Sequence, residues 1–195
     1  MRADRQIRIV LATLLTVGVS GLWAQHPQVR DGFWIGFGFG YGPLKPSCNG
    51  CGTLSSKSSF TGHLRLGGTL RPNVLLGGDI VAWSKSANGI DDVGGNTTAT
   101  VYVYPKVQSG FFLKGGVGLA LFSESPNNSG AGADGTGVGF TLGAGYDLRV
   151  GRNISLTPVG NFLYGAVGDL QMNGGTVRTG WKQTIIEFGL DVTFH

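Results

Sequence analysis

Large apolar residues alternate with small or polar residues along most of the chain after residue 32. Between Phe33 and Tyr41 a large apolar side chain occupies every second position, and Trp34 and glycines fill the positions between them. Because successive side chains of a β-strand point to opposite faces, this period of two predicts a strand with one apolar and one nearly bare face. The same period recurs in seven further segments, which are residues 60–70, 74–83, 99–104, 111–121, 138–149, 154–164 and 186–194. The chain is therefore predicted to be all-β, with eight strands.

The connecting segments alternate in length. Short segments with Pro, Gly or Asn, the residues that favour turns, are 71–73, 108–110 and 151–153. Long segments rich in Gly, Asn and Ser lie between them at 42–57, 84–96, 123–137 and 167–180. This order places all long loops at one end and all short turns at the other. It predicts an eight-stranded antiparallel up-and-down transmembrane β-barrel with short periplasmic turns and four long extracellular loops.

Aromatic residues gather near the ends of the predicted strands. Their amphipathic rings suit the two membrane–water interfaces, so they are expected to form aromatic girdles around the barrel. The residues concerned are Phe33, Tyr41, Phe60, Trp83, Phe111, Tyr164 and Trp181.

The N-terminus has the pattern of an export signal. Three arginines precede an uncharged apolar run over residues 9–22, and the small residue Ala24 follows as a cleavage position. We therefore expect residues 1–24 to be a secretory signal peptide and residues 25–195 to form the outer-membrane barrel domain. Removing the signal takes three arginines and Asp4 from 15 basic and 11 acidic residues, leaving 12 and 10. A net charge of +2 without a basic cluster gives no reason to expect nucleic acid as a partner.

With these features the chain resembles the small outer-membrane β-barrel proteins of the OmpA/OmpX-like and opacity-protein-like group. The resemblance rests on the eight alternating strands, the asymmetry of the connections, the signal and the last strand, which runs from Glu187 to Phe194 before His195. It implies residence in the bacterial outer membrane, with its lipid as a partner. It also implies recognition of a terminal aromatic residue, here Phe194, by the outer-membrane assembly machinery.

Charged residues of both signs share the strand face that the barrel would turn inward. A charge facing lipid would be costly, so these residues are expected to form an internal network of ion pairs and hydrogen bonds. A proton path or a catalytic cluster is the alternative interpretation of such a set. The residues are His63, Arg65, Asp79, Lys114, Asp147, Arg149, Glu187 and Asp191.

The two cysteines of the chain, Cys48 and Cys51, fall in the first long segment. Export places them where disulfides are permitted, and Asn49-Gly50 between them favours a turn. A short-range disulfide is the favoured interpretation, with free thiols or metal and redox chemistry as alternatives. Two thiolates without a further Cys or His nearby do not complete a tetrahedral zinc site.

Enzymatic function finds little support. The exported part holds only His26, His63 and His195, and none stands in the His-x-Ser arrangement of outer-membrane deacylases. We expect no catalytic, cofactor-binding or metal-binding residue and no cofactor. The favoured function is a structural, adhesion or surface-recognition role through the extracellular loops, with an extracellular ligand that the sequence does not identify.

Two alternatives remain open at this point. The inward glycines could leave gaps that make the barrel a narrow pore. Alternatively, a secreted soluble lipocalin-like barrel would turn the apolar face inward to bind an apolar ligand, and Gly32-Phe-Trp34 fits the start of that family.

Overall fold

The computed structural model describes residues 30–126 and 132–195, which lie almost entirely in β-strands. The expected signal peptide, the first residues of the 25–195 domain and His26 lie outside the described residues, so the processing of the N-terminus stays a prediction. The strands are β1 (Phe33–Ser47), β2 (Lys57–Arg71), β3 (Val74–Ala87), β4 (Ile90–Val103), β5 (Phe111–Pro126), β6 (Ala133–Tyr146), β7 (Leu148–Arg149), β8 (Ile154–Met172) and β9 (Gly175–Phe194). In the described part of the chain, no helix is long and apolar enough to cross a membrane.

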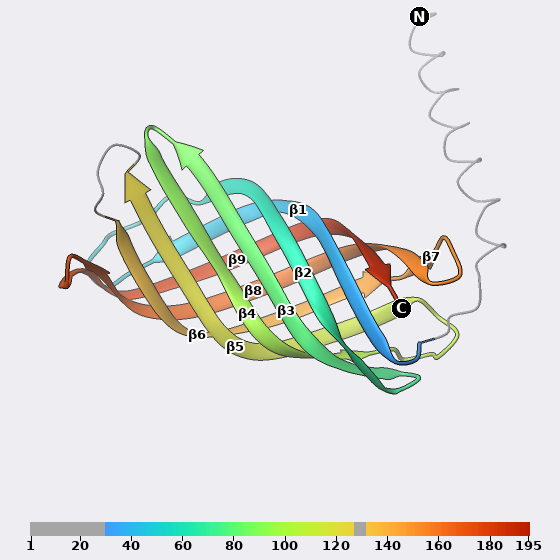
Figure 1. Ribbon diagram of the computed structural model, residues 1–195. Helices are drawn as coiled ribbons and strands as arrows, with labels where there is room; N and C mark the ends of the chain where they lie inside the picture. The colour runs from blue at the N-terminus through green and yellow to red at the C-terminus, as the bar shows by residue number, and fades with distance from the viewer. Residues whose placement is uncertain (1–29, 127–131) are drawn as a thin grey trace, which may run out of the picture.

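Eight of these strands close into a ring. Each long strand pairs antiparallel with its neighbour in sequence, β1 also pairs with β9, and β6 pairs with β8. The two-residue β7 is only an extension beside the start of β8. The prediction of an all-β, eight-stranded, up-and-down antiparallel barrel is confirmed. Figure 1 shows the tilted strands and places the start of β1 and the C-terminus at the same end, which we call the terminal end.

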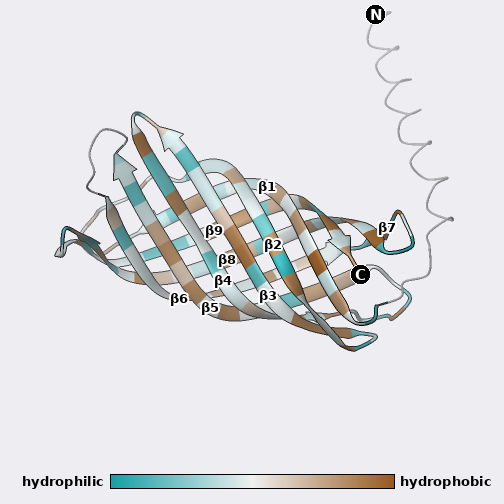
Figure 2. Cartoon of the chain, viewed as in Figure 1, coloured by the Kyte–Doolittle hydropathy of each residue, from teal (hydrophilic) through white to brown (hydrophobic). Residues whose placement is uncertain are grey.

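The opposite end carries the Cys48 and Cys51 segment, and we call it the clasp end. The apolar parity of the strands faces outward along most of the barrel. In β1, Phe37 is 50% exposed and Phe39 is 74% exposed, whereas the intervening inward residues are mostly buried and Trp34 is 2% exposed. Figure 2 shows the resulting alternation of hydrophobic and hydrophilic residues along the strands. An outer surface of this kind suits lipid rather than water. The alternative of a soluble lipocalin-like barrel, which needs its apolar parity inside, is therefore wrong.

Two of the four expected long loops are absent. The expected loop over residues 84–96 is a continuation of β3 and β4, joined by Asn88-Gly89. The expected loop over residues 167–180 is similarly a continuation of β8 and β9, joined by Asn173-Gly174.

All four of these turn residues have positive φ angles between 50° and 79°. Asn-Gly favours the two-residue hairpin turn that requires such angles. The residues next to these turns were predicted to be loops because they are polar and lie beyond the apolar stretch of each strand.

The other connections are closer to expectation. A true loop over residues 48–56 joins β1 to β2, and part of the β5–β6 connection lies outside the described residues. At the terminal end, β2 and β3 are joined by Pro72-Asn73, whereas residues 104–110 form a longer connection than the expected turn at 108–110.

Two of the expected girdle aromatics point inward instead. Trp83 is fully buried and Trp181 is 3% exposed, and both lie in the barrel interior. The Trp83 indole donates a hydrogen bond to the carbonyl of Gly42, at 3.1 Å. Phe33, Tyr41, Phe60 and Phe111 do lie on the outer face with large exposed fractions. Position near a strand end therefore did not distinguish girdle residues from interior residues, whereas strand parity did.

Candidate functional site

The interior of the barrel is filled by three layers of side chains. A charged layer lies near mid-height and is built around His63, Arg65, Asp79, Lys114, Glu187 and Asp191. An apolar cluster fills the clasp end above it, and an aromatic cluster fills the terminal end below it. Glycines on β1 admit the long charged side chains: a Cβ atom on Gly36 would lie 2.7 Å from Arg65 Nε, and one on Gly40 would collide with the Glu187 carboxylate. These glycines therefore accommodate neighbouring side chains, and do not leave an open channel beside β1.

His63 is the centre of the charged layer. Its Nδ1 lies 2.8 Å from Asp191 Oδ1 and its Nε2 lies 3.0 Å from Glu187 Oε2. Both ring nitrogens thus face carboxylate oxygens, which accept hydrogen bonds only, so the arrangement favours the doubly protonated imidazolium. Glu187, which is fully buried, also accepts hydrogen bonds from Thr61 and from Asn161.

Two further cations complete the layer. Arg65 Nε lies 3.4 Å from Asp191 Oδ2, and its guanidinium donates to the hydroxyl of Thr193. Lys114 Nζ lies 2.7 Å from Asp79 Oδ2, and the Tyr102 hydroxyl donates to the same carboxylate. With His63 protonated, three cations face three carboxylates. Such a charge balance is what a low-dielectric interior requires.

Asp147 and Arg149 lie lower, at the terminal end. Asp147 is 1% exposed and accepts hydrogen bonds of 2.8 Å from the hydroxyls of Tyr104 and Thr157. Arg149 is 3% exposed, in the short β7. The predicted set of eight residues is therefore inside the barrel throughout, but at two heights.

The two heights are joined by hydrogen-bonding side chains. The Thr157 hydroxyl lies 3.1 Å from that of Thr193, which accepts from Arg65. Contacts thus run from Asp147 at the terminal end through two threonines and Arg65 to Asp191 and His63 at mid-height.

Arg30 is a member of this lower group that the sequence pattern did not reveal. It is 4% exposed, donates to the carbonyls of Val107 and Ser109 at 2.9 and 2.8 Å, and stacks 3.5 Å from the centre of the Tyr104 ring. Its Nε also lies 4.0 Å from Asp147 Oδ2. Arg30 precedes the first strand and lies outside every alternating segment. The alternation of apolar and polar residues therefore could not indicate that its side chain is buried.

His195 also turns into this end of the barrel. Its Nε2 lies 3.9 Å from Asp147 Oδ2, and its backbone N–H donates to Asn153. Burial lowers the pKa of His195 to about 4, an effect that the nearby Asp147 carboxylate only partly offsets. The C-terminal residue is thus held as a neutral imidazole at neutral pH.

Apolar and aromatic side chains cluster on either side of the charged layer. The clasp-end cluster is made of Leu44, Val81, Trp83, Ala120, Phe122, Ala133, Leu163, Val167, Leu170, Trp181 and Ile185. The terminal-end cluster is made of Trp34, Leu75, Tyr102, Tyr104 and Phe112. Strand parity turns Val81, Trp83 and Phe112 inward as expected, whereas Leu44, Val167 and Leu170 fall in segments that were expected to be loops. Parity does not predict that an apolar cluster fills the clasp end, or that the terminal end combines aromatic rings with Arg30, Asp147 and Arg149.

The 48–56 loop lies at the clasp end. Cys48 and Cys51 are joined as a disulfide in the structure, with Cα atoms 5.5 Å apart, and the backbone N–H of Asn49 donates to Thr179 on β9 at 3.0 Å. Cys48 and Leu54 pack against the clasp-end cluster. The loop therefore lies on the rim of the barrel and is held by β9. Whether the pair is oxidised in the exported protein stays a prediction.

An ion pair crosses the same end. The guanidinium of Arg178 on β9 makes two hydrogen bonds, of 3.1 and 3.2 Å, with the carboxylate of Glu124 on β5. Arg178 also lies 5.4 Å from the ring of Trp181, at the top of the apolar cluster. Because β5 and β9 are not neighbours in the ring, this pair bridges the mouth.

The interior holds one arrangement that resembles a catalytic triad. The Thr61 hydroxyl lies 3.1 Å from His63 Nε2, and His63 Nδ1 faces Asp191. However, Thr61 donates to Glu187, and an imidazolium between two carboxylates has no lone pair with which to accept a proton. Thr61 and His63 are 2% and 8% exposed, so a substrate would have to displace a whole layer. Among the described residues, no group of His, Cys, Asp and Glu is arranged to hold a metal ion.

Solved structures of several bacterial proteins have a similar fold. Neisserial surface protein A matches with a TM-score of 0.57 at 17% identity, over 84% of this chain and 98% of its own. Ail, the attachment invasion locus protein of Yersinia pestis, matches with a TM-score of 0.52 at 13% identity, over 84% of this chain and 99% of its own. Ail in complex with the heparin analogue sucrose octasulfate matches with a TM-score of 0.52 at 12% identity, over the same shares of the two chains. At these identities the similarity establishes the fold alone.

Sequence comparison gives the family. No curated protein matches the chain significantly. The family model of the outer membrane protein beta-barrel domain matches residues 9–194, which is nearly the whole chain. The closed ring of eight strands and the apolar outer face agree with that match. The chain belongs to the outer-membrane β-barrel protein family, and its location is the bacterial outer membrane.

Proposed function

We propose that this protein is a sealed, non-catalytic outer-membrane barrel that acts through its clasp end, as a structural and surface-recognition element of the cell envelope. The observation that carries the proposal is the contrast between a filled interior and an ordered, protruding clasp end. We take the clasp end to face the outside of the cell, because the longest described connection, over residues 48–56, lies there and the hairpins extend furthest beyond the membrane on that side, as in barrels whose longer segments are extracellular.

The filled interior argues against the alternative of a narrow pore. An ion would have to pass the aromatic terminal-end cluster, the paired charges at mid-height and the apolar clasp-end cluster. Trp83, Phe112 and Ile185, which belong to these clusters, are fully buried. The interior of an eight-stranded barrel is only wide enough for side chains, which here fill it from both ends.

The clasp end is suited to recognition because it extends well beyond the membrane. β8 has 19 residues and β9 has 20, whereas about 9–11 residues of a tilted strand cross the hydrocarbon layer. The surplus residues form an ordered platform with the 48–56 loop and the Arg178–Glu124 pair. Binding residues are often found on exposed segments that a rigid scaffold positions.

The similarity to Ail suggests a first probe. One solved structure of Ail holds that protein in complex with a heparin analogue, sucrose octasulfate. We therefore propose to compare cells that display the present protein with matched cells that lack it, on surfaces coated with heparin and on uncoated surfaces. Sensitivity of the same cells to detergent measures the structural role.

The proposal predicts greater retention on heparin, greater detergent resistance, or both. A variant that carries the tight turn Asn-Gly in place of residues 48–56 serves as the control for the clasp end. Unchanged adherence together with unchanged detergent sensitivity, at equal amounts of displayed protein, would contradict the proposal.

Interaction with the assembly machinery is also a proposal. Phe194 is 37% exposed on the outer face and stacks on Phe37, with ring centres 6.1 Å apart. It stands at the end of β9, so it is accessible as a terminal aromatic despite the following His195. Phe194→Ala is expected to lower the amount of assembled barrel in cells more than it lowers refolding of the purified protein. An equal loss in both measurements would indicate a structural role only.

A further inference from the structure

The outer face changes from apolar to basic on two neighbouring strands at the clasp end. On β1 the outward-facing residues are apolar from Phe33 to Tyr41, and Lys45 is the first outward charge beyond them. On β9 the outward-facing residues are apolar from Phe194 back to Ile186, and Lys182 is the first charge beyond Thr184. Each apolar stretch has about the length that crosses the hydrocarbon layer. Both lysines are exposed and lie at the level of the lipid headgroups on the clasp side.

The two lysines are neighbours across the β1–β9 pair. Lys45 is opposite Thr184, and Ser47 is opposite Lys182. Lys45 and Lys182 are therefore diagonal neighbours, about 7–8 Å apart on an antiparallel sheet. Two ammonium groups on flexible stems at this spacing can converge on one anion, and lysine is a common binder of phosphate.

The described residues do not balance the charge at this place. In residues 30–126 and 132–195, neither Lys45 nor Lys182 forms an ion pair. Asp169 of β8 is exposed at a similar level, but its carboxylate accepts a hydrogen bond of 2.9 Å from the backbone N–H of Gly180. An anion between the two ammonium groups would offset the repulsion between these like charges.

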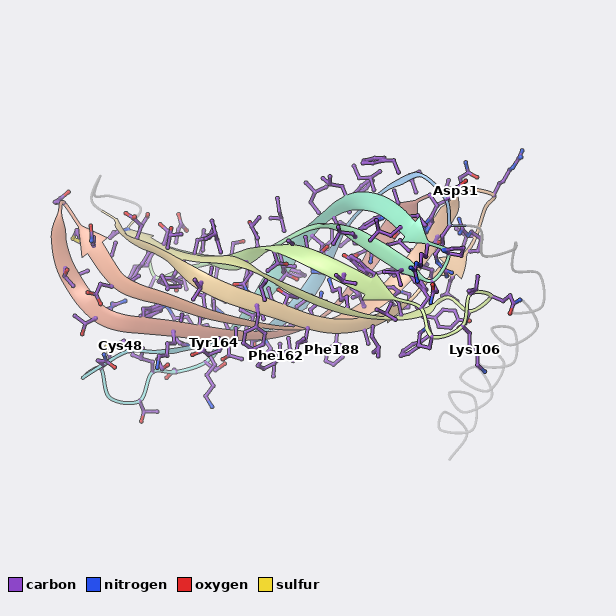
Figure 3. The ribbon with its side chains drawn as sticks, turned by 90° about the horizontal axis from the view of Figure 1, so that it is seen from below. Asp31, Cys48, Lys106, Phe162, Tyr164 and Phe188 are labelled. Carbon is purple, nitrogen blue, oxygen red and sulfur yellow. A yellow bond between two sulfur atoms is a disulfide. The ribbon has the colours of Figure 1, made fainter. Side chains whose placement is uncertain are left out.

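An apolar groove lies below the two lysines on the same outer face. It has a volume of about 350 Å³ and spans β2, β1 and β9. Its lining residues include Phe39, Tyr41, Phe60 and Phe188, and the rings of Tyr41 and Phe60 meet edge to face at 5.3 Å. Figure 3 shows Phe188 in line with Phe162 and Tyr164 on the outside of the barrel. Lys45 lies four positions beyond Tyr41, which is about 13 Å along a strand.

We propose that Lys45, Lys182 and this groove form a binding site for a phosphate-bearing lipid of the outer leaflet. The phosphate lies between the two ammonium groups, and one acyl chain occupies the groove between the aromatic side chains. The site depends on the membrane location of the barrel and rests on the outward orientation of the clasp end proposed above, but it does not depend on the proposed recognition function.

The test measures lipid binding by native mass spectrometry of the full-length exported protein released from non-ionic micelles. The probe is diphosphoryl lipid A, with phosphatidylcholine as the zwitterionic comparison. Each basic residue near an anionic lipid surface contributes a factor of about five, so K45Q/K182Q is expected to bind lipid A about 30-fold more weakly. The matched control K106Q/R152Q removes two exposed cations at the terminal end and should bind as the wild type does.

Two further arms separate the parts of the site. Phe188→Ala should weaken lipid A binding with both lysines in place, because it opens the groove. Millimolar inorganic phosphate should fail to displace lipid A, which distinguishes a lipid from free phosphate as the source of the anion. Both lysines are exposed, and the heat-dependent shift in gel migration verifies that each variant is folded.

The proposal is overturned if K45Q/K182Q binds lipid A as tightly as the wild type. It is also overturned if K106Q/R152Q loses as much affinity, or if inorganic phosphate displaces the lipid. The single variants Lys45→Gln and Lys182→Gln provide a second measurement. Each is expected to bind lipid A about fivefold more weakly than the wild type.

Discussion

The charged layer and the clasp-end cluster fill the same barrel in opposite ways. At mid-height, His63, Glu187 and Asp191 satisfy one another through ion pairs and hydrogen bonds. Above them, fully buried side chains such as Trp83 and Leu170 pack without charge. Both layers face away from lipid, so the lipid-facing pattern alone does not decide which chemistry fills the interior.

The difference teaches where each layer is vulnerable. A charged layer in a low-dielectric interior depends on complete pairing, because one missing partner leaves a buried charge uncompensated. An apolar layer depends on volume, because a missing side chain leaves a cavity. Single substitutions in the two layers should therefore cause stability losses of different size. A second substitution should also change the loss differently in each layer.

The largest effect is expected for Glu187→Leu. This change removes the oxygens that face His63 and accept from Thr61, so it should lower the free energy of unfolding by about 3–5 kcal/mol. Urea unfolding of the barrel in phospholipid vesicles measures the loss. The double variant His63→Leu/Glu187→Leu should recover part of it, because no unpaired imidazolium remains. If the double variant loses more unfolding free energy than the two single variants together, the result would contradict the pairing of His63 with Glu187.

Leu163→Ala in the clasp-end cluster comes next. Leu163 is 1% exposed, and truncating a buried leucine typically lowers the free energy of unfolding by about 3 kcal/mol. The matched control is Leu119→Ala on the outer face, where the side chain is 55% exposed and lipid chains can refill the space. Equal losses for the two variants in vesicles would show that the clasp-end cluster is not tightly packed.

A smaller effect is expected for Cys48→Ser/Cys51→Ser. A disulfide across so short a loop restricts the unfolded chain by no more than about 2 kcal/mol. Because the loop lies on the rim, the change should appear mainly as faster protease cleavage within residues 48–56. Reductant should have the same effect on the wild type. Complete thiol labelling of the native protein without reductant would show that the pair is not oxidised.

The smallest effect is expected from His195. Its folded pKa of about 4 lies below the ordinary value of 6.5, so the unfolded chain binds the proton more tightly. Stability from this group is therefore complete above about pH 6.5 and is lost as the pH falls towards 4. A C-terminal side chain can turn out into water, which limits the loss. His195→Gln should flatten this part of the profile of unfolding free energy against pH, and an unchanged slope would contradict the assignment.

The sequence was sufficient to predict the number of barrel strands and the two faces to which their side chains point. A period of two puts Phe37 and Phe39 on one face of the sheet and Arg65 and Glu187 on the other. The asymmetry of the connections and the resemblance to outer-membrane barrels then predicted that the apolar face is the outer one. This works because a membrane-spanning strand separates apolar from polar residues almost completely over its length.

The alternation of apolar and polar residues did not predict three features of the structure. Hairpins at Asn88-Gly89 and Asn173-Gly174 lie outside the membrane, where strands lose their apolar face and resemble loops. The heights of the interior residues depend on strand register and tilt, so Trp83 was placed in a girdle although its parity pointed inward. Arg30 lies before the first strand, and only the folded structure brings it beside Tyr104 and Asp147.

We expect the three interior layers to seal the barrel against ions. Single-channel recording of the purified, folded protein in planar bilayers tests this most directly, with a heat-denatured sample as the control. A sealed barrel should give a silent baseline without discrete conductance steps. Reproducible ohmic steps that require the folded protein would contradict it and would return the narrow pore as the function of the barrel.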